Sequence, residues 1–271
     1  KEARIALASY GNKILGTLND FMNDPGVEIT TRWNVPRVFM AIPTQESVDI
    51  LIKNINNASP GIRHSVIRVL NRLRVKHPDI VFDKQQIYTA LKEEAKSYYE
   101  IFRVLHLCTQ NGASESEKSD VHLLEKALNE RLIKDKERMF WLLSLVYPPK
   151  DIYNSYIGAS SNNKTLRASG IEFLENILHK DIKEYFMPIV DKASDEDVIS
   201  KSKRIFEIEI KDKTDGLKRL INRKDSWLQS CAIYSADITA SPELKELVES
   251  AKRDRSLVVR ETAELVLKLN K

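Results

Sequence analysis

The segment from Asp254 to Leu269 constrains the fold of this chain more than any other stretch. Its apolar and methyl-bearing side chains recur at steps of three and four, at Leu257, Val258, Thr262, Leu265, Val266 and Leu269. This spacing predicts a helix with one apolar stripe, and Asp254 is a suitable residue to cap its start. Asp195 and Asp225 precede other predicted helices in the same way. A single helix cannot bury such a stripe alone, so the segment predicts helices stacked on one another.

The helical pattern recurs along the chain at intervals near thirty residues. Thirty-one residues separate Arg32 from Arg63, and the same distance separates Gln229 from Arg260. Arg167 has an equivalent place, just inside another predicted helix. Repeats of this length are typical of proteins built from stacked helical hairpins. We therefore interpret Arg32, Arg63, Arg167 and Arg260 as repeat anchors, whose side chains reach a carboxylate or a backbone carbonyl of the neighbouring repeat.

The period breaks between Arg63 and Arg167. Here the sequence predicts two long helices, at 84–108 and 120–146, joined by a polar linker at 109–119. Aromatic side chains are concentrated in the same region, namely Tyr98, Tyr99, Phe102, Phe140 and Trp141. We expect one enlarged helical hairpin within a stack of shorter helix pairs.

The predicted fold is all-α, an α-α superhelix of helical hairpins that forms a single solenoid. It is divided into N-terminal repeats at 1–80, the enlarged hairpin at 81–149 and C-terminal repeats at 150–271. Shorter helices are expected at 3–22 and at 30–41. Pro36 lies inside the second of these and should either bend it or begin it, because proline has no N–H to donate.

The content of turn-forming and apolar residues agrees with a helical fold. Eight Gly and nine Pro among 271 residues are few, which disfavours an all-β fold with many turns. No apolar run approaches the roughly 18–20 residues that a membrane-spanning helix needs. The chain starts with Lys-Glu-Ala-Arg rather than an initiator Met, which allows a start inside a longer protein. A membrane segment or an enzyme domain would then lie upstream.

No catalytic, metal-binding or cofactor-binding site is predicted. The five His residues are scattered, and none has a second His or Cys at the spacing of metal ligands. No Gly-rich phosphate loop is present in the sequence. Cys108 and Cys231 lie among apolar residues, and we expect both to be small core side chains in a reducing compartment.

The second helix of several predicted pairs resembles the HEAT-repeat family, in which that helix often opens D-x-x-x-V-R-x-x-A. Residues 254–263 follow this pattern with one extra residue before Val259-Arg260. Ile62-Arg63 and Leu166-Arg167 are weaker copies, and residues 225–229 lack the Arg. The resemblance covers nearly the whole chain except the enlarged hairpin. It implies an α-α superhelix that presents an extended binding surface.

A narrower resemblance is to the HEAT-repeat region attached to bacterial ATP/ADP-translocase-like membrane proteins. It is carried by Ser9-Tyr10-Gly11, Val35-Pro36-Arg37-Val38, Asn71-Arg72-Leu73-Arg74, His77-Pro78, Glu137-Arg138-Met139-Phe140 and Tyr147-Pro148-Pro149. This resemblance implies a soluble cytoplasmic part at the inner face of the membrane, beside a transport domain. Transport chemistry would then belong to residues outside this chain.

The first functional hypothesis is a non-enzymatic scaffold that binds a protein partner. Its mechanism would be surface complementarity, with Arg and Tyr side chains contributing most of the binding. Tyr98 and Phe102, four residues apart on the enlarged hairpin, form the candidate partner surface together with Arg68 and Arg72.

The second hypothesis is nucleic-acid binding, of the kind seen in helical-repeat DNA glycosylases. Basic clusters lie at 63–76, 201–204 and 218–224, and they would follow a phosphate backbone if they shared one face. Trp227, Asp225 and Arg223 supply the residue types that surround an extruded base in such enzymes. A third hypothesis is that the repeats bind a nucleotide.

Overall fold

The computed structural model describes residues 2–57, 59–110, 118–191 and 193–270. Their regular secondary structure is helical throughout, without β-strands. The all-α class predicted from the sequence is therefore confirmed for the described part of the chain. The chain forms two compact units. The first unit contains residues 1–95 and 136–192, and the second contains residues 96–135 and 193–271.

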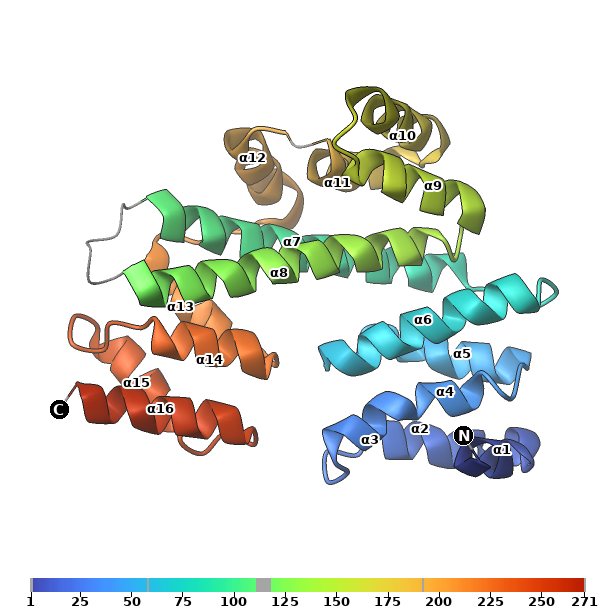
Figure 1. Ribbon diagram of the computed structural model, residues 1–271, viewed down its shortest axis with the longest axis horizontal. Helices are drawn as coiled ribbons and strands as arrows, with labels where there is room; N and C mark the ends of the chain where they lie inside the picture. Colours follow the sequence, from blue (N-terminus) through green and yellow to red (C-terminus); the bar gives the residue numbers. More distant parts are fainter. Residues whose placement is uncertain (1, 58, 111–117, 192, 271) are drawn as a thin grey trace. The chain divides into compact units, whose positions relative to one another are not determined.

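The first unit begins with a series of short helices and ends with a group of three (Figure 1). The short helices are α1 (Glu2–Ala8), the 3₁₀ turn η1 (Gly11–Ile14), α2 (Leu15–Asn23), α3 (Ile29–Asn34), α4 (Pro36–Phe39), α5 (Gln45–Lys53) and α6 (Pro60–Lys76). The later group is α9 (Pro149–Ser160), α10 (Lys164–Ile177) and α11 (Lys180–Val190).

The second unit contains two stacked helix pairs. Its helices after residue 193 are α12 (Asp195–Phe206), α13 (Lys213–Ile221), α14 (Ser226–Tyr234), α15 (Pro242–Ala251) and α16 (Leu257–Leu269). Helix α13 packs on α14 and α15 packs on α16, while α14 contacts α16 and α13 contacts α15. This arrangement buries apolar side chains between successive pairs, as the repeated pattern predicts.

Two long helices contribute residues to both units, namely α7 (Lys84–Gln110) and α8 (Lys118–Leu143). Their extents agree with the enlarged hairpin expected from the sequence. They run antiparallel, because Glu94 is hydrogen-bonded to Arg138 in the first unit, and Ser97 to Asp135 in the second. The linker predicted at 109–119 falls mostly on residues 111–117, which lie outside the described residues. The division at 1–80, 81–149 and 150–271 remains a prediction.

The predicted helix at 3–22 is interrupted in the structure. Gly11 has a φ of +57°, which a continuous α-helix does not allow, and α1 ends three residues before it. Two of the large apolar side chains in this stretch, Ile5 and Phe21, are 62% and 43% exposed. The predicted helix at 30–41 is likewise divided, with Pro36 as the first residue of α4.

The apolar stripe predicted for the last helix was wrong. Helix α16 buries Val259, Ala263 and Val266, and only Val266 belongs to the predicted stripe. Most of that stripe is exposed, including Leu257 at 58% and Leu269 at 70%. Both sets of residues have helical spacing, and α16 has apolar residues around much of its circumference. Spacing alone therefore did not decide which side packs against α14 and α15.

The three predicted caps had different outcomes. Asp225 caps α14 and accepts a hydrogen bond from the backbone N–H of Leu228. Asp195 is the first helical residue of α12, and Ser194 provides the capping oxygen instead. Asp254 lies too early in the chain to cap α16, and its carboxylate accepts hydrogen bonds from the Ser256 N–H and the Gln229 side chain.

Within the described residues, every helix is either too short or too polar to cross a lipid bilayer.

Both cysteines are buried, as expected, with Cys108 3% and Cys231 1% exposed. Burial raises the pKa of each thiol to about 11.

Helices α9 and α10 are in very close contact at two glycines, and this contact yields a stability prediction. A Cβ on Gly170 would lie 2.9 Å from the backbone N of Ala159, and a Cβ on Gly158 would lie 2.9 Å from the carbonyl O of Leu166. We expect Gly170→Ala to lower the free energy of unfolding by about 1–3 kcal/mol, because backbone atoms have to move. Thermal unfolding followed by circular dichroism measures the effect.

Gly16→Ala is the matched control. Gly16 lies in α2, and a Cβ at this residue would have no neighbouring atom within 4 Å. Alanine is the better helix former, so this variant should be neutral or more stable by up to about 1 kcal/mol. Equal effects of the two substitutions would contradict a close contact between α9 and α10.

Candidate functional site

Helix α6 carries the candidate site on its exposed side. Pro60 occupies the first turn, where its missing N–H has no cost, and the buried side consists of Ile62, Val66, Ile67, Val69, Leu70 and Leu73. The helix contains five Lys and Arg residues and no Asp or Glu. Arg68, Arg72 and Lys76 follow one another at steps of four and are all exposed. The apolar packing of α6 therefore leaves a row of cations facing solvent.

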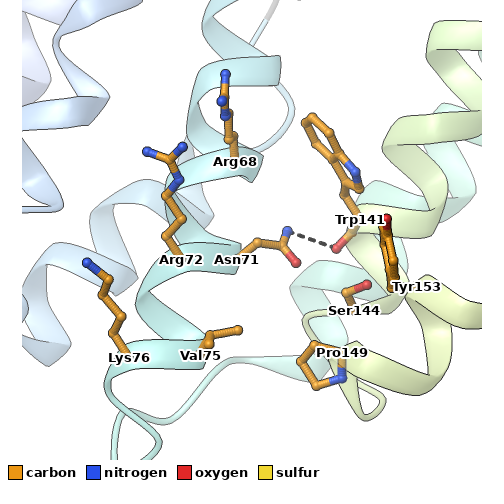
Figure 2. Close-up of a pocket in the computed structure, with 9 residues that line it drawn as sticks. All are labelled: Arg68, Asn71, Arg72, Val75, Lys76, Trp141, Ser144, Pro149 and Tyr153. Atoms are coloured by element: carbon orange, nitrogen blue, oxygen red, sulfur yellow. Dashed lines mark hydrogen bonds between the residues drawn. The ribbon is translucent and has the colours of Figure 1, made fainter.

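A groove of about 350 Å³ lies beside this row, within the first unit. Figure 2 shows Arg68, Arg72 and Lys76 on the α6 side of the groove, with Trp141 of α8 and Tyr153 of α9 across from them. Val75, Ser144 and Pro149 also line it. We call this the α6 groove. The structure thus brings together Arg68 and Arg72, two of the four residues predicted for the partner surface.

The cations of the α6 groove are not neutralised by nearby acids. Among the residues that the structure describes, no carboxylate lies within 4.0 Å of the charged nitrogens of Arg68, Arg72 or Lys76. Arg72 has one polar contact, 3.9 Å from its Nη1 to the sulfur of Met40. Like charges at steps of four repel one another along a helix. The row is therefore electrostatically unfavourable by itself and would be stabilised by an anion.

The opposite wall is aromatic and is attached to α6 by a side-chain amide. The Nδ2 of Asn71 donates to the carbonyl of Trp141 at 3.0 Å and to that of Ile67 at 2.9 Å (Figure 2). The Trp141 ring also packs on His64, with ring centroids 4.9 Å apart. Tyr153 is 61% exposed. Asn71 and His64 thus fix Trp141 relative to the cations, while the ring of Tyr153 remains accessible.

A buried ionic group positions both walls of the groove. Glu94 of α7 accepts hydrogen bonds from Arg63 Nη1 at 2.6 Å and from Arg138 at 3.0 and 3.1 Å. The side chains of Glu94 and Arg138 are 1% and 3% exposed. Burial acts to raise the pKa of Glu94, but the charges of Arg138 and Arg63 outweigh it, so the pKa lies below its usual value. Because Arg63 is on α6 and Arg138 is on α8, one carboxylate links the two walls.

The other proposed anchors contact backbone carbonyls. Arg32 donates to the carbonyl of Met22 in the last turn of α2, at 2.8 Å, and Arg167 donates to that of Asp191 after α11, at 3.2 Å. Arg260 differs, since it donates to the carbonyls of Asp254 and Arg255 in the loop before its own helix. Two carbonyls of that loop lie within hydrogen-bond distance of Arg260. Through these bonds Arg260 therefore fixes its own loop and does not contact a neighbouring helix pair.

Tyr98 and Phe102 form a separate aromatic pair in the second unit. Their rings are nearly parallel, with centroids 6.3 Å apart, and Tyr98 also meets Tyr99 edge to face. Burial, followed by the charges of Asp135 and Asp195, raises the pKa of Tyr98 to about 12. Both side chains are half-buried and contribute to the packing of α7, and their role in binding a partner remains a prediction.

The residues proposed to surround an extruded base lie in the second unit, namely Arg223, Asp225 and Trp227. The two charged ones already have partners. Arg131 donates to Asp225 at 2.6 Å, and Arg223 donates to Glu100 at 3.2 Å and to Ser97 at 2.7 Å. Trp227 is 53% exposed. An extruded base would have to compete with these bonds for both charged residues.

The other two basic clusters are also largely paired. Lys203 lies 3.4 Å from Glu209, Lys218 contacts Glu243, and Arg219 lies 3.8 Å from Asp215. Of the three clusters in the sequence, the one on α6 therefore has the largest set of uncompensated charges among the described residues.

The histidines remain dispersed in the structure. His106 Nδ1 lies 3.0 Å from Asp195, His179 lies 3.5 Å from Asp181, and His64 packs on Trp141. Among the described residues, no group of three or more His, Cys, Asp or Glu is close enough to hold a metal ion.

Glu94→Gln tests the ionic group that links the groove walls. The buried Arg138 and the half-buried Arg63 would both lose the charge of Glu94, so we expect a loss of about 3–5 kcal/mol in the free energy of unfolding at neutral pH. Because the folded pKa of Glu94 is lowered from 4.5, the stabilisation is complete above that value and is lost as pH falls through the folded pKa. The difference in melting temperature between the native protein and the variant should therefore shrink in acid.

Glu93→Gln is the control for this measurement. Glu93 is the exposed neighbour of Glu94 on the same helix, so its substitution should change the melting temperature little at any pH. If the Glu94 variant melts below the native protein by the same number of degrees at neutral pH and at about pH 3, an ionised Glu94 between the two arginines is contradicted.

Comparisons with known proteins identify no family for this chain. No protein-family model matches it, and no curated protein matches its sequence. A function therefore has to be inferred from the geometry and charge of the α6 groove.

Proposed function

We propose that this chain is a non-enzymatic scaffold of HEAT-like helix pairs, arranged as an α-α superhelix, that binds an acidic segment of a protein partner in the α6 groove. The observation that supports it most is the row of Arg68, Arg72 and Lys76, exposed and without acidic neighbours in the described structure. A groove with an aromatic wall lies directly beside these charges. Charge complementarity favours an acidic partner and speeds its association.

The stacking of helix pairs supports the repeat architecture. The pairs α13 with α14 and α15 with α16 pack successively, which is how a solenoid builds a continuous core. Arg32 and Arg167 each bind a carbonyl at the end of another helix. Attachment to a nucleotide-translocase-like membrane domain, at the cytoplasmic face of an inner membrane, is the narrower proposal. It rests on the sequence resemblance alone.

Nucleic-acid binding is the second candidate, and the aromatic wall favours it. Trp141 and Tyr153 lie across from the cations, and bases stack on such rings while phosphates contact Arg and Lys. The pairing of the other two basic clusters counts against a long phosphate track. A strand bound in the α6 groove would have few further cations to follow.

Charge reversal in the groove tests the proposed function. The probes are a fluorescein-labelled oligoglutamate peptide and a labelled oligothymidylate of similar charge, with binding followed by fluorescence anisotropy at low salt. We expect the double variant Arg68→Glu, Arg72→Glu to weaken oligoglutamate binding at least tenfold, because two attractive charges become repulsive. Added salt should weaken binding by the native protein.

The matched control is Lys92→Glu, Lys180→Glu. Both lysines are exposed in the first unit, lie outside the groove, and give the same change in net charge. If both double variants lose oligoglutamate binding equally, the attraction depends on the net charge of the protein, and the groove is not the binding site. Binding of oligothymidylate alone, sensitive to the Arg68 and Arg72 changes, would favour the second candidate.

A further inference from the structure

We infer that the occupant of the α6 groove is an amphipathic α-helix, with a row of carboxylates beside a row of apolar side chains. This inference rests on the proposed function and adds the conformation and register of the bound segment. The way in which α6 presents its side chains supports it.

Helix α6 presents two adjacent rows of side chains to the groove. Arg68, Arg72 and Lys76 form one row, and Asn71 and Val75 form the next. Residues at steps of four are about 6 Å apart along a helix axis and form an oblique ridge. Two helices commonly pack with such ridges aligned. A second helix with carboxylates at steps of four can therefore place each of them near one cation of the row.

The apolar row of the ligand would contact the apolar part of the groove, which lies beside the row of cations. Val75 is 68% exposed, and it faces Trp141 and Pro149 across the groove. A helix with its side chains is about 10–12 Å across, so a groove of about 350 Å³ admits single side chains while the helix lies on its rim. This mode, in which apolar anchors enter a groove, is common in helix recognition.

The polar groups of the groove favour a peptide over a base. Both amide hydrogens of Asn71 are donated to protein carbonyls, and the hydroxyl of Ser144 is donated to the carbonyl of Phe140 at 3.0 Å. The amide hydrogens of Asn71 and the hydroxyl of Ser144 are therefore not free to read the edge of a base, whereas an apolar side chain needs neither. The free cations then bind carboxylates that flank the apolar anchor.

The test compares two labelled peptides of identical composition. The patterned peptide carries Glu at i, i+4 and i+8 with Leu at i+3 and i+7, and the control peptide distributes the same residues around the helix. The helicity of both is measured by circular dichroism. We expect the native protein to bind the patterned peptide about tenfold more tightly than the control peptide. This is the gain in affinity expected from three exposed ion pairs that form together.

Two single substitutions separate the apolar contact from the charges. Val75→Ser should weaken binding of the patterned peptide about fivefold and leave oligoglutamate binding unchanged, because it removes apolar surface only. Val81→Ser is the matched control, since Val81 is another exposed valine of the first unit and does not line the groove.

The outcomes distinguish this inference from the proposed function. Equal binding of the two peptides, still lost in the Arg68→Glu, Arg72→Glu variant, would overturn the helical register but keep an acidic partner. If the Arg68→Glu, Arg72→Glu variant binds the peptides as well as the native protein does, both the helical register and the proposed acidic partner are overturned. Preference for the labelled oligothymidylate over either peptide would also overturn both, in favour of nucleic acid.

Discussion

The salt bridges of Glu94 are the interaction on which the rest of the first unit depends. A carboxylate that is almost fully removed from water has to be paired, because an isolated buried charge is very costly. Arg63 and Arg138 supply two counter-charges and three hydrogen bonds. They come from different helices, so satisfying one carboxylate fixes α6 and α8 against α7. The groove between those helices is a consequence of that pairing.

The same pairing separates two roles of arginine on α6. Arg63 is used internally, and its charge is balanced by Glu94. Arg68 and Arg72, within three turns of it, have no acidic neighbour among the described residues. Lys76 in the last turn is favoured by the helix dipole, but Arg68 and Arg72 lie too far from the helix end to gain much from it. Their repulsion is therefore a cost to folding that a bound anion would offset.

The sequence predicted the helices more accurately than their packing. The two long helices were located to within three residues at each end, and Pro36 does form a helix boundary. The single helix at 3–22 failed at Gly11, where the chain adopts a positive φ that spacing does not reveal. In α16 two apolar stripes have the same period, and the choice between them depends on where α14 and α15 lie.

The candidate site was predictable only in part. Arg68 and Arg72 could be selected because α6 contains many bases and no acids. Trp141 stands out in the sequence only as part of an aromatic region, and Tyr153 gives no signal, because its exposure depends on the packing of α9. Tyr98 and Phe102 have helical spacing, and in the structure they form a half-buried stacked pair, which the spacing alone does not reveal.

The contrast among the three basic clusters shows which property of a charged surface indicates binding. The two clusters of the second unit together contain seven basic side chains, against five on α6. Of the seven, Lys203, Lys218 and Arg219 each have a carboxylate within reach. Exposed pairs of this kind contribute little to stability, but they cancel the local potential. On α6 the potential is not cancelled, and it lies beside a groove with an aromatic wall. The distribution of acids around a basic cluster, set by tertiary structure, therefore matters more than the number of bases.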